Sequence, residues 1–164
     1  MKHSYEIALW GLLLSASISD LIYGKIFNAL VFPFFFLGLL AQGWHAGIEG
    51  FLHALLSGLL AFALFFPLYQ LRIMGAGDVK LFMAVGTWVS YAILLWLSGL
   101  SVVIGALVGG GILLKKLGFV GAATNVGSHL SRSVTPKSHR MPFAPAVLCA
   151  FIFLRIAEIY QWKF

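Results

Sequence analysis

Charged residues are scarce in this chain of 164 residues. Only 10% are Asp, Glu, Lys or Arg, whereas 61% are hydrophobic. A soluble domain usually carries about 25% charged residues, so these side chains are too few to cover a surface that faces water. The composition therefore excludes an ordinary soluble domain and predicts a protein whose solvent is the lipid bilayer.

Cysteine is almost absent, and the histidines are scattered. Cys149 is the single cysteine, so the chain offers no internal disulfide and no Cys-x-x-Cys metal pair. His45, His53, His129 and His139 show no metal-binding spacing such as His-x-x-x-His. We therefore expect no metal site.

Long uncharged runs fill most of the chain. Ile26–Ile48, Gly50–Leu71 and Leu81–Leu114 contain no Asp, Glu, Lys or Arg. Roughly 20 apolar residues span a bilayer as a helix. Spanning segments are either helices or closed barrels, and these runs lack the alternation of barrel strands. The sequence predicts an all-α membrane protein that forms a single domain over residues 1–164.

Six helices fit the pattern. They are about Tyr5–Ile22, Asn28–Gln42, Gly50–Leu71, Asp78–Trp88, Tyr91–Leu114 and Phe143–Tyr160. The run from 81 to 114 is too long for one crossing, and we divide it at Gly86–Ser90, beside aromatic residues suited to the membrane interface. The first stretch has features of a secretory signal peptide, but its apolar run continues to Ile22, so we expect a spanning helix there.

The basic residues gather on one side of this topology. Eight of the eleven fall in or beside its first, third and fifth connections: Lys25, Arg72, Lys80, Lys115, Lys116, Arg132, Lys137 and Arg140. Positive charge favours the cytoplasm, so both termini are predicted on the non-cytoplasmic side. The net charge of +6 is explained by this topology and by anionic lipid headgroups, and we expect no nucleic-acid partner. Residues 115–140 are predicted to form a basic cytoplasmic loop, either a linker against lipid or a docking surface.

Acidic residues are the rarest charged type, and only two of the five are aspartates. Glu6, Glu49 and Glu158 fall on or near the predicted outer face, whereas Asp20 and Asp78 lie at helix ends on the inner face. Each aspartate has a structural interpretation, since Asp78 could cap its helix and Asp20 could sit in the wet interface. Ionisable groups within membrane spans are nevertheless costly, which makes both functional candidates.

Two neighbouring carboxylates predict a specific chemistry. They cannot both ionise cheaply, so they share a proton, as in aspartic proteases. The ionised carboxylate takes a proton from water, and the protonated one donates a hydrogen bond to the scissile carbonyl. Gly75 and Gly77 precede Asp78 and lack a Cβ atom. They permit unusual backbone angles and the close approach of an extended substrate strand.

Three segments resemble one family. "GAGDVKLF" at Gly75–Phe82 resembles the Gly-x-Gly-Asp signature of the type IV prepilin peptidases. "SISDLIYGKIFN" at Ser17–Asn28 resembles their first-aspartate segment, and "RMPFAPAV" at Arg140–Val147 resembles the Pro-Phe-Gly-Pro segment that opens the last helix. Phe27 replaces the usual proline and Ala144 the usual glycine. These departures affect local geometry and remove no catalytic group.

The resemblance implies a six-helix aspartyl endopeptidase with Asp20 and Asp78 as the catalytic pair. The supporting residues would be Gly75, Gly77, Lys80 and Asn28. It implies cleavage of pilin precursors after a glycine that ends a basic leader, at the cytoplasmic face of the bacterial inner membrane. The small size resembles the type that serves tight-adherence pili, and no cofactor is expected. The partners would be the pilin precursor, the lipid bilayer and the pilus-assembly machinery.

Three other functions are considered. A proton-coupled carrier would relay protons through Asp20 and Asp78, but it predicts polar groups that continue through the bilayer core, and none appear. Presenilin-type proteases share Gly-x-Gly-Asp, but their other aspartate follows a tyrosine, whereas Asp20 follows Ser19. A noncatalytic subunit of a pilus or secretion assembly would require that both aspartates be dispensable.

Overall fold

The structure is all-helical. This computed structural model describes the backbone of residues 3–129 and 143–159 and, within them, the side chains of 6–111 and 143–157. These residues form five helices and no strand: α1 (His3–Tyr23), α2 (Asn28–Gln70), α3 (Ala76–Gly86), α4 (Tyr91–His129) and α5 (Ala144–Ile159). The predicted fold class is thereby confirmed.

Three of these helices are long and apolar enough to cross a bilayer. The candidate spans are Glu6–Tyr23, Asn28–Gln70 and Tyr91–Gly111, and α5 adds a shorter apolar stretch. The number of six spans and the sides on which the termini lie stay predictions.

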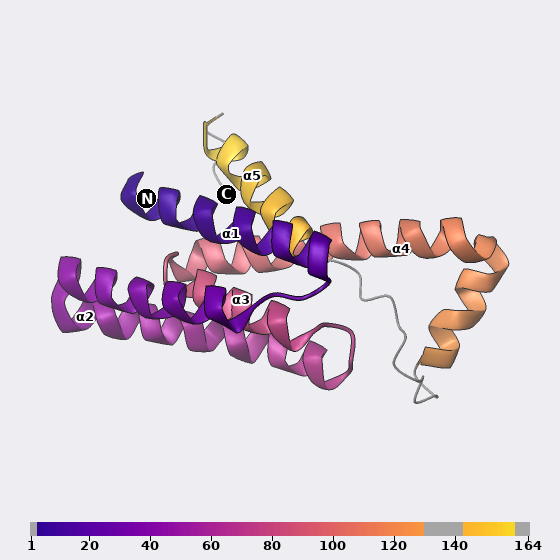
Figure 1. Cartoon of the computed structure of the whole chain (residues 1–164), viewed down its shortest axis with the longest axis horizontal. Helices are drawn as coiled ribbons and strands as arrows, with labels where there is room; N and C mark the ends of the chain where they lie inside the picture. The colour runs from indigo at the N-terminus through magenta and orange to yellow at the C-terminus, as the bar shows by residue number, and fades with distance from the viewer. Residues whose placement is uncertain (1–2, 130–142, 160–164) are drawn as a thin grey trace.

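The helix α2 contains both of the spans predicted between residues 28 and 71. A straight helix of 43 residues would be about 65 Å long, roughly twice the hydrocarbon thickness of a bilayer. Its backbone is non-helical at Ala46 and Gly47, where Gly47 has φ 63° and ψ −149°, and the two arms fold back side by side (Figure 1). The predicted connection at Gly43–Glu49 is correctly placed but too long, because the reversal needs only these two residues and a positive φ that suits glycine.

The short helix α3 packs against both arms of α2. Trp88 Nε1, just beyond α3, donates a hydrogen bond to the carbonyl oxygen of Phe34 in the first arm at 2.9 Å. In the second arm, Ser57 Oγ donates to the carbonyl oxygen of Val89 at 3.3 Å. Gly86 lies so close to this arm that an added Cβ would be 2.8 Å from Ser57 O. Glycine here brings the two backbones together, as small residues do between membrane helices.

The helix α4 begins at Tyr91, as predicted, but continues well beyond the predicted end at Leu114. Its distal half extends away from the other helices (Figure 1). The prediction of a loop over 115–140 is therefore wrong for residues 115–129. The stretch has two lysines, one leucine and two alanines, which favour helix, and no proline, so the helix continues although Gly118, Gly121 and Gly127 disfavour it. Residues 130–140 lie outside the part of the chain that the structure describes.

The first and last helices pack together. Buried Leu9, Leu13 and Ala16 recur along one side of α1 at intervals of three or four residues. Trp10 meets Phe151 of α5 with ring centroids 5.1 Å apart. The same buried stripe continues one further turn to Asp20, which is why this carboxylate lies inside the bundle rather than on its surface.

Candidate active site

Three distant segments meet at one end of the helix bundle, where α1 ends and α3 and α5 begin (Figure 1). Lys80 of α3 donates a hydrogen bond from Nζ to Asn28 Oδ1 of α2 at 3.1 Å. The ring of Phe82 lies 6.2 Å, between centroids, from that of Phe143, just before α5. We call the residues 17–28, 75–82 and 143–147 the motif cluster. These residues comprise two of the segments that resemble the peptidase family, Ser17–Asn28 and Gly75–Phe82, and the described part of the third, Arg140–Val147.

Asp20 is held by the start of α5. The residue is only 8% exposed, and its Oδ2 accepts a hydrogen bond from the backbone N–H of Ala144 at 3.1 Å. The backbone N–H of Phe143 also donates to this carboxylate. Phe143 occupies the N-cap position of α5, where its side chain has no acceptor for the free amides of the first turn. Asp20 therefore caps α5 from another helix, with its negative charge at the positive end of the helix dipole.

The chain turns sharply after Asp20. Gly24 has φ 60°, and its N–H donates to the carbonyl oxygen of Asp20 at 2.9 Å. Ser19 Oγ donates to the carbonyl oxygen of Lys25 at 2.7 Å. A glycine in the left-handed region is a common way to end a helix. These bonds fix the path by which α1 leads into α2.

Asp78 is the third residue of α3, not the first as predicted, because the helix begins at Ala76. Its Oδ2 accepts a hydrogen bond from the backbone N–H of Gly75, the N-cap residue, at 3.1 Å. This is one half of a capping box, and Gly75 has no side chain to complete the other half. A carboxylate at this position also suits the helix dipole. Like Asp20, Asp78 thus holds a backbone amide near the start of a helix.

The two glycines of the Gly-Ala-Gly-Asp segment provide space rather than unusual backbone angles. Gly75 has φ −78° and ψ 151°, an extended conformation open to any residue. The expectation of special backbone angles is therefore wrong for Gly75. A Cβ on Gly75 would lie 3.1 Å from Asp78 Oδ2, and one on Gly77 would lie 3.2 Å from Ile26 Cβ. Close approach is the property used at both positions.

Lys80 and Asn28, which the resemblance offered only as supporting residues, contact each other directly. The Lys80 ammonium lies 5.7 Å from the centroid of the Phe32 ring, in addition to its bond to Asn28. Together these contacts tie the beginning of α2 to the second turn of α3. They place a positive charge two residues from Asp78 along the chain, in the same motif cluster.

The residues that hold Asp20 were not predicted from the sequence. The donors are backbone N–H groups of residues 143 and 144, which no side-chain pattern can show. A weak signal was present, since Phe143 cannot cap a helix with its own side chain. An acceptor had to come from elsewhere in the chain or from solvent.

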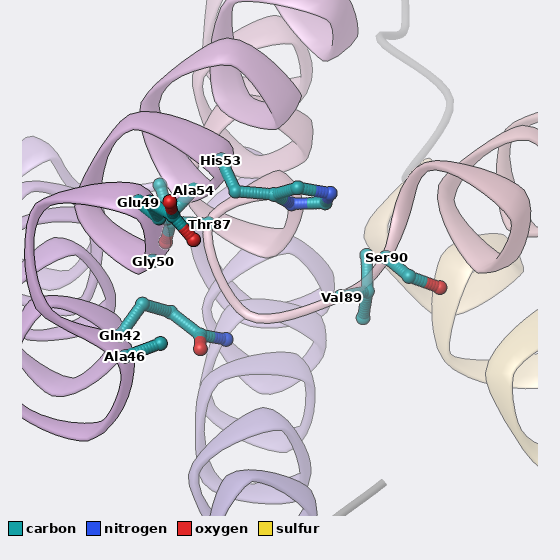
Figure 2. A pocket seen from close by; sticks show the side chains of 9 residues that line it. All are labelled: Gln42, Ala46, Glu49, Gly50, His53, Ala54, Thr87, Val89 and Ser90. Atoms are coloured by element: carbon teal, nitrogen blue, oxygen red, sulfur yellow. The ribbon is translucent and has the colours of Figure 1, made fainter.

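A cavity of about 370 Å³ lies at the opposite end of the helices, near the break in α2 (Figure 2). Its lining residues are Gln42, Ala46, Glu49, Gly50, His53, Ala54, Thr87, Val89 and Ser90. The ring of His53 packs on that of Tyr91, with centroids 4.1 Å apart. None of the predicted site residues lines this cavity. Among the described residues, no group of three or more His, Cys, Asp or Glu could hold a metal ion.

The chain has the features of a helical membrane protein: three of its described helices are apolar and long enough to span a bilayer. One aspartate lies near the end of α1 and the other at the start of α3. A family model, the type IV leader peptidase family, matches residues 7–110, and the chain belongs to this family. The match includes both aspartates but ends before Phe143. Membership identifies a peptidase and, with the apolar helices, a membrane protein. No curated protein and no solved structure matches the chain.

Proposed function

We propose that this protein is an aspartyl endopeptidase that removes the basic leader from type IV or tight-adherence pilin precursors. The catalytic pair is Asp20 and Asp78. The observation that carries the proposal is the motif cluster: the chain has two aspartates, and the segments that hold them contact each other through Lys80 and Asn28. Family membership supports a peptidase of this kind.

The proposed reaction needs both carboxylates and one water molecule. The pair carries one proton between its two members. The ionised aspartate takes a proton from water, whose oxygen attacks the scissile carbonyl carbon while the other aspartate donates a hydrogen bond to the carbonyl oxygen. The tetrahedral intermediate then collapses, the C–N bond breaks, and the departing amine takes up the proton. The N–H groups of Ala144 and Gly75 orient one carboxylate each.

The proposed place of cleavage is the cytoplasmic face of the bacterial inner membrane. The support is the charge distribution, because the connections at the end of the motif cluster hold Lys25 and Arg72, with Lys80 beside them. The partners in this proposal are the pilin precursor, the bilayer and the pilus-assembly machinery. The three basic residues at this end oppose the approach of a basic leader, so the proposal requires that anionic headgroups neutralise them and that the aspartate pair provides the local attraction.

One observation favours a second candidate, a noncatalytic assembly subunit. Both aspartates accept a hydrogen bond from a backbone amide at the start of a helix, which is a sufficient structural reason for a carboxylate at either position. Asparagine separates the two functions. Its side-chain oxygen still accepts the capping bond, with nearly the same preference at helix starts, but it cannot exchange the proton.

The test is cleavage of a co-expressed small pilin precursor, followed as a shift on a gel. Wild type should shorten the precursor, whereas Asp20→Asn and Asp78→Asn should accumulate in the membrane and leave it intact. Glu49→Gln makes the same chemical change at an exposed position beside the cavity and should cleave normally. Equal trimming by both aspartate variants would refute the catalytic pair and support the structural function.

A further inference from the structure

The ring of Phe143 fits against a glycine of α4. A Cβ added at Gly105 would lie 2.5 Å from Cε2 and 3.0 Å from Cδ2 of this ring. The centroid of the ring also lies 6.2 Å from that of Phe82 in α3, which itself stacks on Phe65 of α2 at 3.9 Å between centroids. Phe143 is thus held between α4 and α3 at the point where the chain enters α5.

The backbone at the same point holds Asp20. The N–H of Ala144 reaches Asp20 Oδ2 at 3.1 Å, and the carbonyl oxygen of Phe143 accepts the first bonds of α5 from Ala146 and Val147. Pro145 has no N–H, so the first turn presents few free donors. The ring of Phe143 and the amides near Asp20 thus belong to the same two residues at the start of α5.

We propose that Gly105 and Phe143 are positioning residues for the catalytic aspartate. The missing side chain of Gly105 admits the Phe143 ring, the ring fixes the start of α5, and the start of α5 orients Asp20. The inference rests on the proposed function, because it assigns the effect of these contacts to the reaction.

The distances give the size of the effect. An ordinary van der Waals contact begins near 3.4 Å, so an alanine at Gly105 must displace the ring by close to 1 Å from the 2.5 Å contact. The inference requires that the ring, which also packs near Phe82, passes this displacement to the backbone of Phe143 and Ala144. The bond from Ala144 to Asp20 is 3.1 Å long, and a backbone displacement close to 1 Å along it takes it past the length at which a hydrogen bond persists. Misplacement of a catalytic group by about 1 Å lowers the rate on the order of 100-fold.

The first experiment measures precursor cleavage by purified Gly105→Ala. We expect kcat to fall about 10- to 100-fold with KM unchanged, because the substrate still binds. Gly99→Ala is the matched control on the same helix, since nothing lies within 4 Å of its added Cβ, and it should retain wild-type kcat. In the double variant Gly105→Ala with Phe143→Leu, the smaller leucine side chain packs against the added methyl group and should hold the start of α5 in place of the ring, so most of the loss should be recovered.

A second measurement does not depend on cleavage. The exchange rate of the Ala144 amide hydrogen, followed by NMR, reports the bond to Asp20 directly. We expect exchange to be about tenfold faster in Gly105→Ala and in Asp20→Ala, as the loss of one hydrogen bond predicts, and unchanged in Gly99→Ala.

Each outcome decides one of the two claims. Unchanged kcat and unchanged exchange in Gly105→Ala would overturn the inference, as would a loss that the double variant does not restore. If Gly105→Ala fails to fold, a folded and active double variant supports the inference, and a folded but inactive one overturns it. If wild type cleaves no precursor, the proposed function fails, and the exchange rates still decide whether Gly105 holds the start of α5.

Discussion

Replacing Asp20 with alanine and, separately, with asparagine separates its capping function from its charge. Alanine removes the acceptor and leaves the N–H of Ala144 without its partner, at a site where Ala144 is fully buried and Asp20 only 8% exposed. Leaving one buried donor unsatisfied costs about 1–3 kcal/mol, and losing a helix cap costs about 0.5–2 kcal/mol. Both substitutions remove the charge, so the desolvation of the carboxylate cancels in the comparison between them.

We therefore expect Asp20→Ala to be about 2 kcal/mol less stable than Asp20→Asn. For a chain of this size, this difference corresponds to about 4–8 °C in melting temperature. The assay is thermal unfolding of both variants in the same mild detergent, monitored by helical circular dichroism. Glu49→Gln should melt with wild type, because Glu49 is an exposed residue at the far end of the molecule. Equal melting temperatures for the alanine and asparagine variants would refute the assignment of Asp20 as the cap of α5.

Three further changes test the packing. Gly86→Ala places a Cβ 2.8 Å from the backbone oxygen of Ser57, which cannot rotate away, so thermal unfolding should show a loss of about 1–3 kcal/mol. Arg155 and Glu6 form an ion pair at 2.6 Å with side chains 21% and 13% exposed. A double-mutant cycle should therefore give a coupling energy of at least about 1 kcal/mol, and additive effects would contradict the pair. Ser17 has a buried hydroxyl with no hydrogen-bond partner among the described residues, so Ser17→Ala should raise the melting temperature slightly, by about 2–4 °C.

The helical class of the fold could be predicted from composition and from uncharged runs because the membrane imposes these properties on every residue of a span. Tyr91 begins α4 as expected, since the interfacial aromatic and the uncharged run mark the same boundary. α1 was also expected almost to its full length. A spanning helix is predicted from the apolar character of about 20 residues together, so one atypical residue does not change the prediction.

Single-residue geometry could not be predicted in the same way. The reversal inside α2 depends on the positive φ of Gly47, one of the 18 glycines in the chain. The start of α3 depends on Gly75, which caps with its backbone and not with a side chain. The extension of α4 to His129 could not be predicted, because its basic residues and its three glycines are both more typical of a loop.

In the candidate site, too, the polar side chains could be predicted from the sequence, whereas the backbone contacts could not. Both aspartates could be identified because carboxylates are rare and costly in a membrane protein. Asp20 accepts a hydrogen bond from the backbone amide of Ala144, and in our proposal the ring of Phe143 and the small size of Gly105 hold that amide in place. None of these groups is a polar side chain. The family match ends at residue 110, so it includes Gly105 of α4 but not Phe143, whose ring packs against Gly105. A candidate site defined by its acids alone would therefore omit α5, although the first amide of α5 donates a hydrogen bond to Asp20.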